Sequence, residues 1–434
     1  MLGLKLTIPN NYIDVVENDI MADEKIDKKK HNPMDDLPEH DHRKLGLKLG
    51  LFSIQDDLGA GLPVFHPKGA ILWRVVENFL TELVLKEGYQ IVKTPHVYKA
   101  ELWEKSGHMD KYKDNMFFSE VDGQKFGVKP MNCPGHIYIY KAGSHSYREL
   151  PIRLAEIATV YRNEMSGNLS GLTRVRGFAQ DDAHIFCRED QIEKEVKKMI
   201  ELTLQVYKTF GLKIDHIELS TRPEKFIGDV KIWDKAEKIM EKVLKDNKVN
   251  YKLNPGDGAF YGPKIDTHIK DVLGRSWQLG TIQLDFFMPK RFDVNYVSDD
   301  NTKVRCVMLH RTILGSMERF LALLIEQYKG EFPVWLAPVQ VRVINMNDDL
   351  IEYSEGIKSE LRQNFRVDSD YRSESIGKKI RDAEKAKVPY IIVIGGKEKE
   401  SGKLAVRSRG AKPRFGVSMN EFVKEVQGKI DEKT

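Results

Sequence analysis

The sequence predicts an α+β fold in two parts: a larger domain over residues 41–334, built on antiparallel strands, and a smaller α/β domain over residues 335–434. The first observation is that 149–162 has the pattern of a helix or turn followed by a strand and 177–186 that of its antiparallel return, with a loop rich in glycine, serine and asparagine between them. The second is a proline-containing boundary, beyond which strands alternate with helices as in small domains with parallel or mixed strands. The third is length, because 434 residues can form two or three domains with complete cores.

The elements of the larger part follow from the spacing of apolar residues. Residues 1–40 are predicted to be a short, partly flexible extension with one or two strands, because its second half is strongly charged. Further along, apolar residues at helical spacing predict helices and shorter apolar runs predict strands. In chain order we expect a helix from Ile71 to Leu83 that Gly88 ends, a strand at 89–97 interrupted by Pro95, a helix at 191–210, strands at 276–287 and 304–308, and a helix at 311–328.

The smaller part begins after Pro333 to Pro338 and has an excess of positive charge. From Tyr371 to Arg414 there are 13 Lys and Arg against 5 Asp and Glu. A basic stretch of this kind can follow a phosphate backbone, although a solvated surface explains it equally well. The expected elements are strands at 339–344, 390–394 and 404–407, and helices at 350–364, 377–386 and 419–430.

Composition excludes several classes of protein. Charged residues make up 31% and hydrophobic ones 41% of the chain, which is typical of a globular protein. Three cysteines offer no disulfide framework and suit a reducing cytosol. We expect no membrane span and no secretory or mitochondrial leader, and so a cytoplasmic protein. Neither a P-loop nor a Rossmann glycine motif occurs, so these two nucleotide sites are not indicated.

Cys133, His184 and His310 each lie in a segment dense in functional groups. Cys133 belongs to Lys129–His136, His184 ends Phe178–His184, and His310 begins a run that contains Gly315, Ser316 and Arg319. One thiolate and two imidazoles suit zinc, and three protein ligands leave a coordination position open, as in catalytic zinc sites. Spacing alone also fits three unrelated residues, so the zinc hypothesis depends on the neighbouring segments.

Two arginines from different elements could bind a nucleotide triphosphate. The strand at 149–162 is expected to place Arg162 and Glu164 on one face, and Arg319 is expected in the helix that begins near His310. A guanidinium suits phosphate, and two of them could stabilise charge as pyrophosphate departs. Phe178 could stack on a purine. For each arginine, a surface ion pair is the plainer alternative.

Several longer segments resemble a known family. Tyr161–Glu164, the glycine-containing loop and Gly177–Asp182 resemble the second signature motif of class II aminoacyl-tRNA synthetases, and Gly315–Arg319 resembles the third. The segment around Pro95 resembles the first, whose proline lies at a two-fold dimer interface. Within that class the resemblance is to threonyl-tRNA synthetases, through the segments Met131–His136, Asp182–His184, Gly258–Asp266 and Trp277–Phe286.

The resemblance implies a role for each matching residue. Zinc would be held by Cys133, His184 and His310 and would take the amino and hydroxyl groups of threonine. The amino acid would also be bound by Met131, Gln180, Asp182, Tyr261 and Gln283, with Asp182 accepting from the hydroxyl. ATP would be bound by Arg162, Glu164, Arg174, Phe178, Gln278, Thr281, Ser316 and Arg319. Among these, Arg162 would hold the α-phosphate, Arg174 and Arg319 the outer phosphates, and Lys264 would lie near the reacting carboxylate.

The implied reaction is ATP-dependent activation of L-threonine to an adenylate, followed by transfer to the terminal adenosine of tRNA(Thr). The resemblance implies a homodimer with one Zn²⁺ per chain, and Mg²⁺ should accompany ATP because triphosphate charge needs neutralising. A metal and Asp182 together demand a hydroxyl, so valine would leave buried polar groups unmet. Serine loses only a methyl group, worth about 1–3 kcal/mol, and should be misactivated.

The sequence departs from the family pattern in three places. The paired histidines of the family's editing domain have no counterpart in His31, His40 and His42, so we expect no editing in cis and a possible need for a separate deacylating protein. Met165 and Ser170 replace residues that are often Pro and His. In the smaller part Lys387, Glu398 and Arg407 are the expected anticodon contacts, but Lys387 and Ser373 stand where bacterial-type relatives have Arg and Asn. A lysine cannot replace a bidentate guanidinium.

Two alternatives stay open at this point. A prolyl or seryl enzyme of the same class is disfavoured by the set of Cys133, His184 and His310. A catalytically retired paralogue that binds RNA or regulates another protein would usually lack a phosphate-binding arginine or a metal ligand, and all of these are present.

Overall fold

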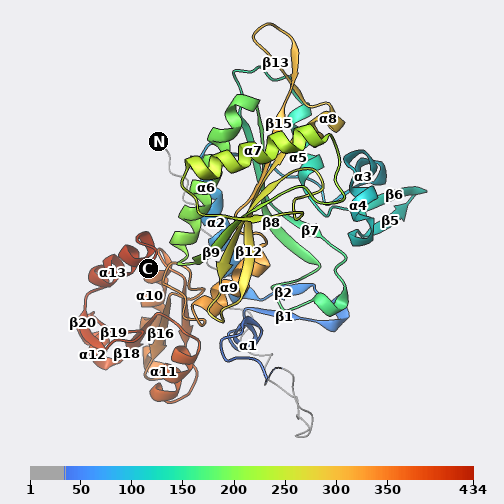
Figure 1. Ribbon diagram of the computed structural model, residues 1–434. Helices are drawn as coiled ribbons and strands as arrows, with labels where there is room; N and C mark the ends of the chain where they lie inside the picture. Colours follow the sequence, from blue (N-terminus) through green and yellow to red (C-terminus); the bar gives the residue numbers. More distant parts are fainter. Residues whose placement is uncertain (1–33, 35) are drawn as a thin grey trace. The chain divides into compact units, whose positions relative to one another are not determined.

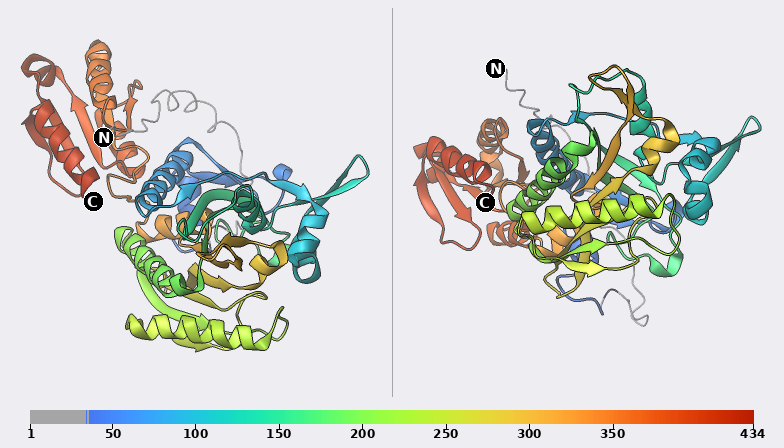
Figure 2. Two further views of the ribbon diagram at one scale, coloured as in Figure 1. Left: turned by 90° about the horizontal axis from the view of Figure 1, so that it is seen from above. Right: turned by 45° about the horizontal axis from the view of Figure 1, so that its top comes forward.

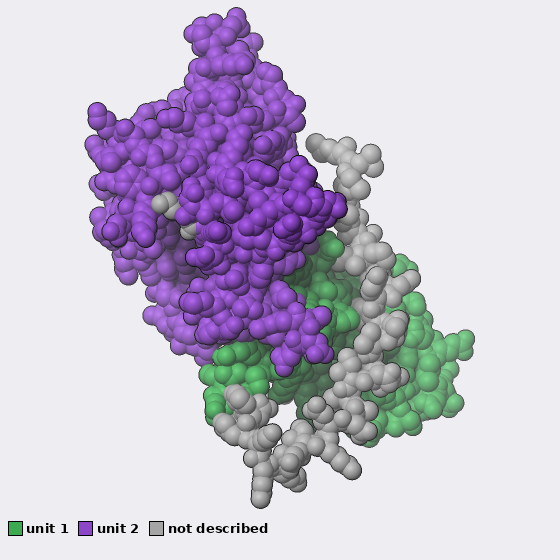
Figure 3. All heavy atoms as spheres, turned by 90° about the vertical axis from the view of Figure 1, so that its right-hand side faces the viewer, with its two compact units in different colours: residues 1–53, 64–76, 328–434 green, residues 54–63, 77–327 purple. Residues whose placement is uncertain are grey.

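The computed structural model describes residue 34 and residues 36–434, so the one or two strands expected in the N-terminal extension, within 4–16, lie outside the described residues. Contact clustering divides the chain into two compact units, which Figure 3 colours separately. One unit holds residues 54–63 and 77–327, and the other holds the C-terminal residues 328–434 with shorter N-terminal segments. Each unit is described by itself.

An eight-stranded sheet forms the centre of the larger unit (Figure 1). All neighbouring pairs are antiparallel except the two at the sheet edges, β10–β9 and β3–β7, which are parallel. The strand order is β10 (Lys252–Asn254), β9 (Lys213–Ser220), β11 (Lys264–Lys270), β12 (Ser276–Asp285), β15 (Val307–Thr312), β8 (Gly177–Cys187), β7 (Ile152–Tyr161) and β3 (Gln90–Ile91). The predicted α+β class is therefore confirmed.

The pairing register aligns polar residues in rows across one face of this sheet. Directly paired residues of neighbouring strands have their side chains on the same face. One row runs through Lys264, Gln283, His310 and His184. The next runs through Asp266, Thr281, Thr312, Asp182 and Glu156. Residues that are far apart in the sequence thus meet on one surface because the strands pair in this order.

Helix α6 (Ile192–Thr209) covers the opposite face. It contacts β9, β12 and β15 and packs beside α7 (Val230–Asp246), as Figure 2 shows. Gly280 points to this face, and a Cβ there would lie 2.8 Å from the Tyr207 hydroxyl, so only glycine fits. The same hydroxyl donates to the carbonyl of Ile313 and accepts from the amide of Gly280. This hydroxyl therefore connects α6 to strand β12 and to the residue that follows β15.

Several further helices and short strands complete the chain before residue 328. Helix α9 (Met317–Gln327) packs on β8, and β4 (Val97–Lys99), β6 (Gln124–Val128) and β5 (Phe118–Val121) form a three-stranded sheet. The others are α1 (His42–Lys48), β1 (Phe52–Ile54), β2 (Pro63–Phe65), α2 (Pro67–Lys86), α3 (Ala100–Ser106), α4 (His108–Tyr112), α5 (Cys133–Lys141), α8 (Phe287–Phe292), β13 (Asn295–Val297) and β14 (Lys303–Arg305).

Four expectations for local structure are wrong. The segment 89–97 is not one strand, because the chain leaves the sheet after β3 and pairs elsewhere as β4 beyond Pro95. The strand expected at 304–308 is two strands, β14 and β15, with Cys306 between them. The helix expected at 311–328 begins at Met317 rather than near His310, since His310 belongs to β15. Strand β7 ends at Tyr161, so Arg162 and Glu164 lie in the irregular segment after it.

The C-terminal residues form a five-stranded mixed sheet, in which the three expected strands are joined by two at 367–370 and 414–417 that were not expected. Strand β16 (Val341–Asn345) pairs in parallel with β17 (Val367–Asp370) and β18 (Tyr390–Ile394), and β19 (Leu404–Ser408) and β20 (Arg414–Val417) continue antiparallel. The helices are α10 (Ile351–Arg362), α11 (Ile376–Lys385), α12 (Gly396–Ser401) and α13 (Met419–Asp431). Among the described helices, none has both the length and the apolar character needed to cross a membrane.

Candidate active site

A cavity of about 540 Å³ opens on the polar face of the eight-stranded sheet. Its walls come from β8, β12 and β15, the start of α9 and the loop before β11. The predicted site residues that line it are Met131, Cys133, Arg162, Glu164, Arg174, Phe178, Gln180, Asp182, Tyr261, Lys264, Gln278, Thr281, Gln283, His310, Ser316 and Arg319. His184 is fully buried next to His310. The structure thus brings together segments that span nearly 190 residues of sequence.

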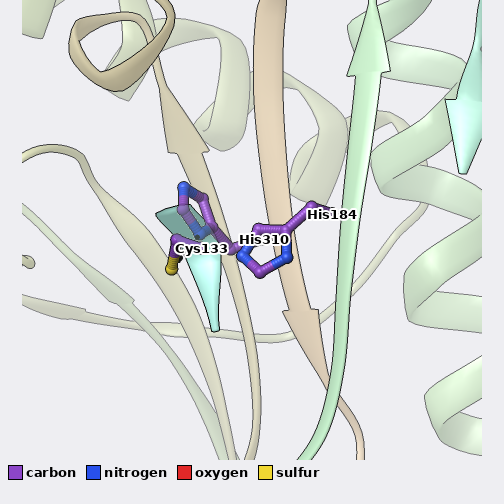
Figure 4. Close-up of side chains that lie close together, drawn as sticks. All are labelled: Cys133, His184 and His310. Carbon is purple, nitrogen blue, oxygen red and sulfur yellow. Dashed lines mark hydrogen bonds between the residues drawn. The ribbon is translucent and has the colours of Figure 1, made fainter. Parts of the chain in front are cut away.

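The candidate zinc ligands converge from three elements (Figure 4). Cys133 is the first residue of α5, His184 lies on β8 and His310 lies on the neighbouring β15, paired with His184. One ligand atom of each lies within 4.8 Å of the others, and Sγ of Cys133 is 3.5 Å from Nδ1 of His310. All three residues are buried. The set can therefore close around one ion without movement of the backbone.

The other nitrogens of both imidazoles already have partners. Nε2 of His310 lies 3.0 Å from Oδ2 of Asp285, and Nδ1 of His184 lies 2.8 Å from Nδ1 of His136. Nε2 of His184 is buried and has no hydrogen-bond partner among the described residues. A carboxylate orients His310, as is usual for a metal ligand, whereas the His136 imidazole orients His184. The donor set therefore fits zinc, with Nε2 of His184 and Nδ1 of His310 facing the ion.

Burial sets the protonation state of these ligands. It lowers the pKa of His184 well below its usual value, so the imidazole is in the neutral form that binds metals. Burial also raises the pKa of the Cys133 thiol well above its usual value. A thiolate here therefore requires a nearby cation, and a bound metal supplies that charge.

Polar groups beside this trio could bind a small amino acid. Asp182 accepts from Nδ2 of Asn132 at 3.1 Å, and burial raises the pKa of its carboxyl. The Tyr261 hydroxyl donates to Oε1 of Gln283 at 2.6 Å. Sδ of Met131 lies 3.0 Å from Nε2 of the buried His108, whose pKa burial lowers to about 3. A neutral His108 leaves this wall uncharged.

Lys264 lies at the other end of the row and is held by two carboxylates. Its Nζ is 2.7 Å from Asp266 and 2.9 Å from Asp257. Burial disfavours the charged ammonium, but Asp266 and then Asp257 outweigh it and raise the pKa of Lys264. Asp266 also accepts from Gln278 at 2.6 Å and from Thr281 at 2.7 Å. Lys264 is therefore a fixed positive charge on the cavity wall.

Three arginines gather where the cavity opens. Arg319 is mostly buried and donates to the carbonyls of Thr173 and Gln278, each at 3.0 Å. Burial and the charges of Arg174 and Arg162 lower the pKa of Arg319. Mutual repulsion of this kind makes the region a site for a polyanion. Arg174 is paired with Glu164 at 2.9 Å, and this pair would separate if each bound a different part of one ligand.

Phe178 lies beneath the Arg162 guanidinium, which is 5.0 Å from the ring centroid. The next residue, Ala179, donates its amide to both carboxyl oxygens of Glu318 at 3.1 Å. Burial raises the pKa of Glu318 to about 8. Gly315 has φ +72°, and a Cβ there would lie 2.9 Å from the carbonyl oxygen of Leu279. The Glu318 carboxylate therefore fixes the backbone next to Phe178, and Gly315 lets the turn before α9 lie close to Leu279.

Sequence reasoning missed several residues of this site. Tyr112 lines the cavity, with its ring centroid 5.8 Å from the Arg162 guanidinium, and Asp257 holds Lys264. Asp266 was included only as the last residue of the Gly258–Asp266 segment, although it connects three of the predicted residues. Its alternation with Lys264 on one strand is the signal that could have shown it. Tyr112 had no such signal, because it reaches the site from a separate short helix.

The expected anticodon residues lie in the C-terminal unit. Lys387 follows α11 in a left-handed conformation, φ 59°, and pairs with Glu331 at 2.7 Å. Glu398 accepts from the amide of Gly395 at 3.0 Å and so caps α12. Arg407 lies on β19 and is partly exposed. No hydrogen bond or ion pair joins these three residues in the part of the chain that the structure describes.

Family descriptions match most of the chain. That of the tRNA synthetase class II core domain (G, H, P, S and T) matches residues 117–328. That of an anticodon binding domain matches residues 340–429. All the site residues predicted from the sequence fall in the first range, whereas Tyr112 precedes it, and Lys387, Glu398 and Arg407 fall in the second.

Individual relatives agree with these matches. The chain is 49% identical over 404 residues to a threonine–tRNA ligase of Clostridium botulinum and 48% identical over 404 residues to one of Sulfurihydrogenibium. These matches cover 93% of the chain and 63% of each relative, so the chain spans less than two thirds of their length. The crystal structure of the RNA binding domain of threonyl-tRNA synthetase from Cryptosporidium parvum superposes with a TM-score of 0.87 at 40% identity, covering 90% of this chain and 98% of that one.

Proposed function

Because the chain belongs to the threonyl-tRNA synthetase family, we propose that it is an ATP-dependent threonine–tRNA ligase. Residues 41–334 form the catalytic domain in this proposal, and residues 335–434 bind the anticodon. The observation that carries it is the convergence of Cys133, His184 and His310 with the three arginines on one face of one sheet. One end of the cavity suits a hydroxylated amino acid and the other suits a triphosphate.

ATP binds at the arginine end. Arg162 takes the α-phosphate, while Arg174 and Arg319 take the outer phosphates. Phe178 stacks on the adenine, and Glu164 accepts from its amino group after it separates from Arg174. Gln278, Thr281 and Ser316 line the remaining ATP surface, and Mg²⁺ accompanies the triphosphate because its charge exceeds what three guanidinium groups neutralise.

Threonine binds at the other end. Cys133, His184 and His310 would hold a zinc ion, which would supply a Lewis acid for the amino and hydroxyl groups of the substrate. Asp182 accepts from the same hydroxyl, a role for which its burial and its contact with Asn132 prepare it. Gln180, Gln283, Tyr261 and Met131 enclose the rest of the amino acid. The pocket thus selects for a side chain that carries a hydroxyl group.

The chain's own residues then favour two successive transfers. A threonine carboxylate oxygen attacks the α-phosphorus, and the bond to the departing pyrophosphate breaks. Arg162 and Arg319 stabilise the charge that builds on the phosphate oxygens, and Lys264 neutralises the carboxylate as it approaches. A hydroxyl of the terminal adenosine of tRNA(Thr) next attacks the carbonyl carbon, and AMP leaves.

Amino-acid specificity gives the test of this function. In amino-acid-dependent pyrophosphate exchange we expect threonine to be the best substrate, serine to be active and weaker by about 10–200-fold, and valine and proline to be inactive. Serine keeps the hydroxyl and loses one methyl group, whereas valine leaves Asp182 without a donor. Exchange that is fastest with proline, or equal for valine and threonine, would contradict the proposed pocket.

The same pocket has a consequence for accuracy. We propose that these 434 residues hold no second, hydrolytic site, so that Ser-tRNA(Thr) persists until a separate deacylating protein removes it. Isolated Ser-tRNA(Thr) is expected to hydrolyse at the spontaneous rate in the presence of this protein. Rapid protein-dependent deacylation would instead reveal an editing site within the chain.

We further propose a homodimer formed through the region of Pro95. Edge strand β3 and strand β4 flank this proline, and Ile91 and Val97 are each 47% exposed. Two large apolar side chains beside an unpaired strand edge favour association. Sedimentation is expected to give twice the mass of one chain, and Ile91→Asp is expected to give a monomer. Leu204→Asp, at an exposed apolar residue of α6, serves as the control and should stay dimeric. A wild-type monomer that still aminoacylates would rule the dimer out.

We also propose that the protein works in the cytoplasm. All three cysteines are buried and free, which suits a reducing cytoplasm.

A further inference from the structure

We propose that His216, Glu218 and His268 form a second metal site, separate from the Cys133 site, that takes a divalent transition-metal ion such as Zn²⁺. One ligand atom from each residue lies within 4.8 Å of the other two. None of the three lines the active-site cavity. The site is not needed for the proposed ligase reaction, so the two proposals stand or fall separately.

Strand pairing brings the three residues together. His216 and Glu218 are two residues apart on β9, so their side chains lie on one face. His268 lies on the adjacent strand β11 and is paired directly with His216, and Asp266 is paired with Glu218. A register shift follows this pair, which leaves Asp215 as an extra residue in β9. A bulge of this kind re-aims side chains, and it lets the consecutive residues Asp215 and His216 contact each other.

The Glu218 carboxylate lies against both imidazoles. Its Oε1 is 2.9 Å from Nε2 of His216, and its Oε2 is 3.5 Å from Nε2 of His268. The two rings stack with their centroids 4.4 Å apart and an interplanar angle of 10°. Donor atoms on one tetrahedral ion lie roughly 3–3.5 Å apart, because each bond is about 2.0–2.2 Å long. The two N···O distances match this spacing but reach different oxygens of Glu218, and the nearly parallel rings must tilt for both nitrogens to face one ion.

Two neighbouring groups hold the ligands in place. Asp215 lies 2.9 Å from Nδ1 of His216, so this imidazole can donate to a carboxylate and present its other nitrogen to a metal. Nδ2 of Asn254, on edge strand β10, donates to Oε2 of Glu218 at 2.9 Å. A histidine oriented by a carboxylate and a hydrogen-bonded carboxylate ligand are both features of working metal sites. A surface ion pair would need neither of these supports.

The donors and their exposure decide which ion fits. Two imidazoles and one carboxylate suit Zn²⁺, Co²⁺ or Ni²⁺ and are poor ligands for Mg²⁺ or Ca²⁺, which take oxygen atoms. The side chains are 17%, 19% and 18% exposed for His216, Glu218 and His268, so an ion can reach them from solvent. Three protein ligands leave coordination open to water. A bound ion would connect β9 to β11, two residues along the strand from Asp266.

Cobalt titration of the full-length protein tests this inference, after chelator treatment and dialysis. The Cys133 site should show a thiolate-to-cobalt charge-transfer band, whereas the proposed site has no sulfur ligand and should add cobalt d–d absorption alone. We expect wild type to bind one more equivalent of Co²⁺ than His268→Ala or Glu218→Gln, and all three to keep the charge-transfer band. Glu218→Gln keeps the size of the side chain. This variant therefore tests the site even if His268→Ala does not fold.

His145→Ala is the matched control. His145 is 18% exposed and lies 3.2 Å from Glu149, so it is an imidazole beside a carboxylate without a second histidine. This variant should bind as many equivalents as wild type. Equal cobalt binding by wild type, His268→Ala and Glu218→Gln would overturn the proposal and leave these residues as a hydrogen-bonded cluster only.

Discussion

Cys133→Ser is expected to abolish stoichiometric zinc binding and threonine-dependent pyrophosphate exchange together. Serine keeps the shape of cysteine, but its hydroxyl is a poor ligand beside two imidazoles. The three donors converge in a buried pocket, and Nε2 of His184 has no hydrogen-bond partner among the described residues. Loss of one ligand therefore removes the ion rather than shifting it. Without the ion, Asp182 is the one proposed contact left for the threonine hydroxyl, so we expect threonine binding itself to be lost.

Cys306→Ser provides the control for removal of a buried thiol. Sγ of Cys306 lies 3.1 Å from the Tyr140 hydroxyl, a hydrogen bond that serine can keep. This variant should retain zinc and exchange activity. Metal analysis of protein purified without chelator, together with calorimetry of threonine binding, separates the outcomes. Absence of stoichiometric zinc from the wild type, or full activity of Cys133→Ser, would overturn the metal assignment.

The parts of the fold that the sequence predicts well are those in which local pattern and final contacts agree. Strand β8 and helix α6 were expected within one residue of their observed ends, and the strand expected in the later part of 149–162 is β7, which ends at Tyr161. All three are long, strongly periodic segments with clear loop residues beside them. In the C-terminal sheet β18 is apolar on both faces, and the strands at 390–394 and 404–408 were also located closely.

The parts that failed depend on contacts made elsewhere in the chain. Strand β9 has the sequence Lys-Ile-Asp-His-Ile-Glu-Leu-Ser, whose polar residues gave no clear strand signal. Its place in the sheet depends on pairing with β11, which follows more than 40 residues later. The start of α9 was set too early because β15 is as apolar as the helix. A periodic pattern cannot separate two apolar segments that a short turn joins.

The candidate site shows the same division. The sequence motifs identified the individual site residues. Their order across the sheet depends on how the strands pair, which the sequence did not show. The row from Lys264 through Gln283 and His310 to His184 crosses four strands that lie out of sequence order. For the same reason His216 and His268 had no significance in the sequence, since more than 50 residues separate them.

Arg162→Ala and Arg319→Ala are each expected to slow adenylate formation by on the order of 10²-fold or more, as the loss of a preorganised charge-stabilising donor does. Threonine binding should be unchanged, because neither guanidinium is placed at the metal end of the cavity. Arg319→Lys should recover little of the lost rate. Arg319 reaches the carbonyls of Thr173 and Gln278 with separate nitrogens, and a lysine ammonium cannot reproduce that planar fork.

Arg222→Ala is the matched control for Arg162→Ala. Arg222 also lies over an aromatic ring, 5.3 Å from the centroid of Phe226, and also makes a hydrogen bond, to Asp234 at 2.9 Å. It lies outside the active-site cavity, so its loss should leave pyrophosphate exchange near the wild-type rate. If Arg222→Ala slows exchange as much as Arg162→Ala, then loss of packing rather than loss of phosphate contact explains both effects. Near-normal exchange by Arg162→Ala or Arg319→Ala would show that this arginine does not stabilise the departing pyrophosphate.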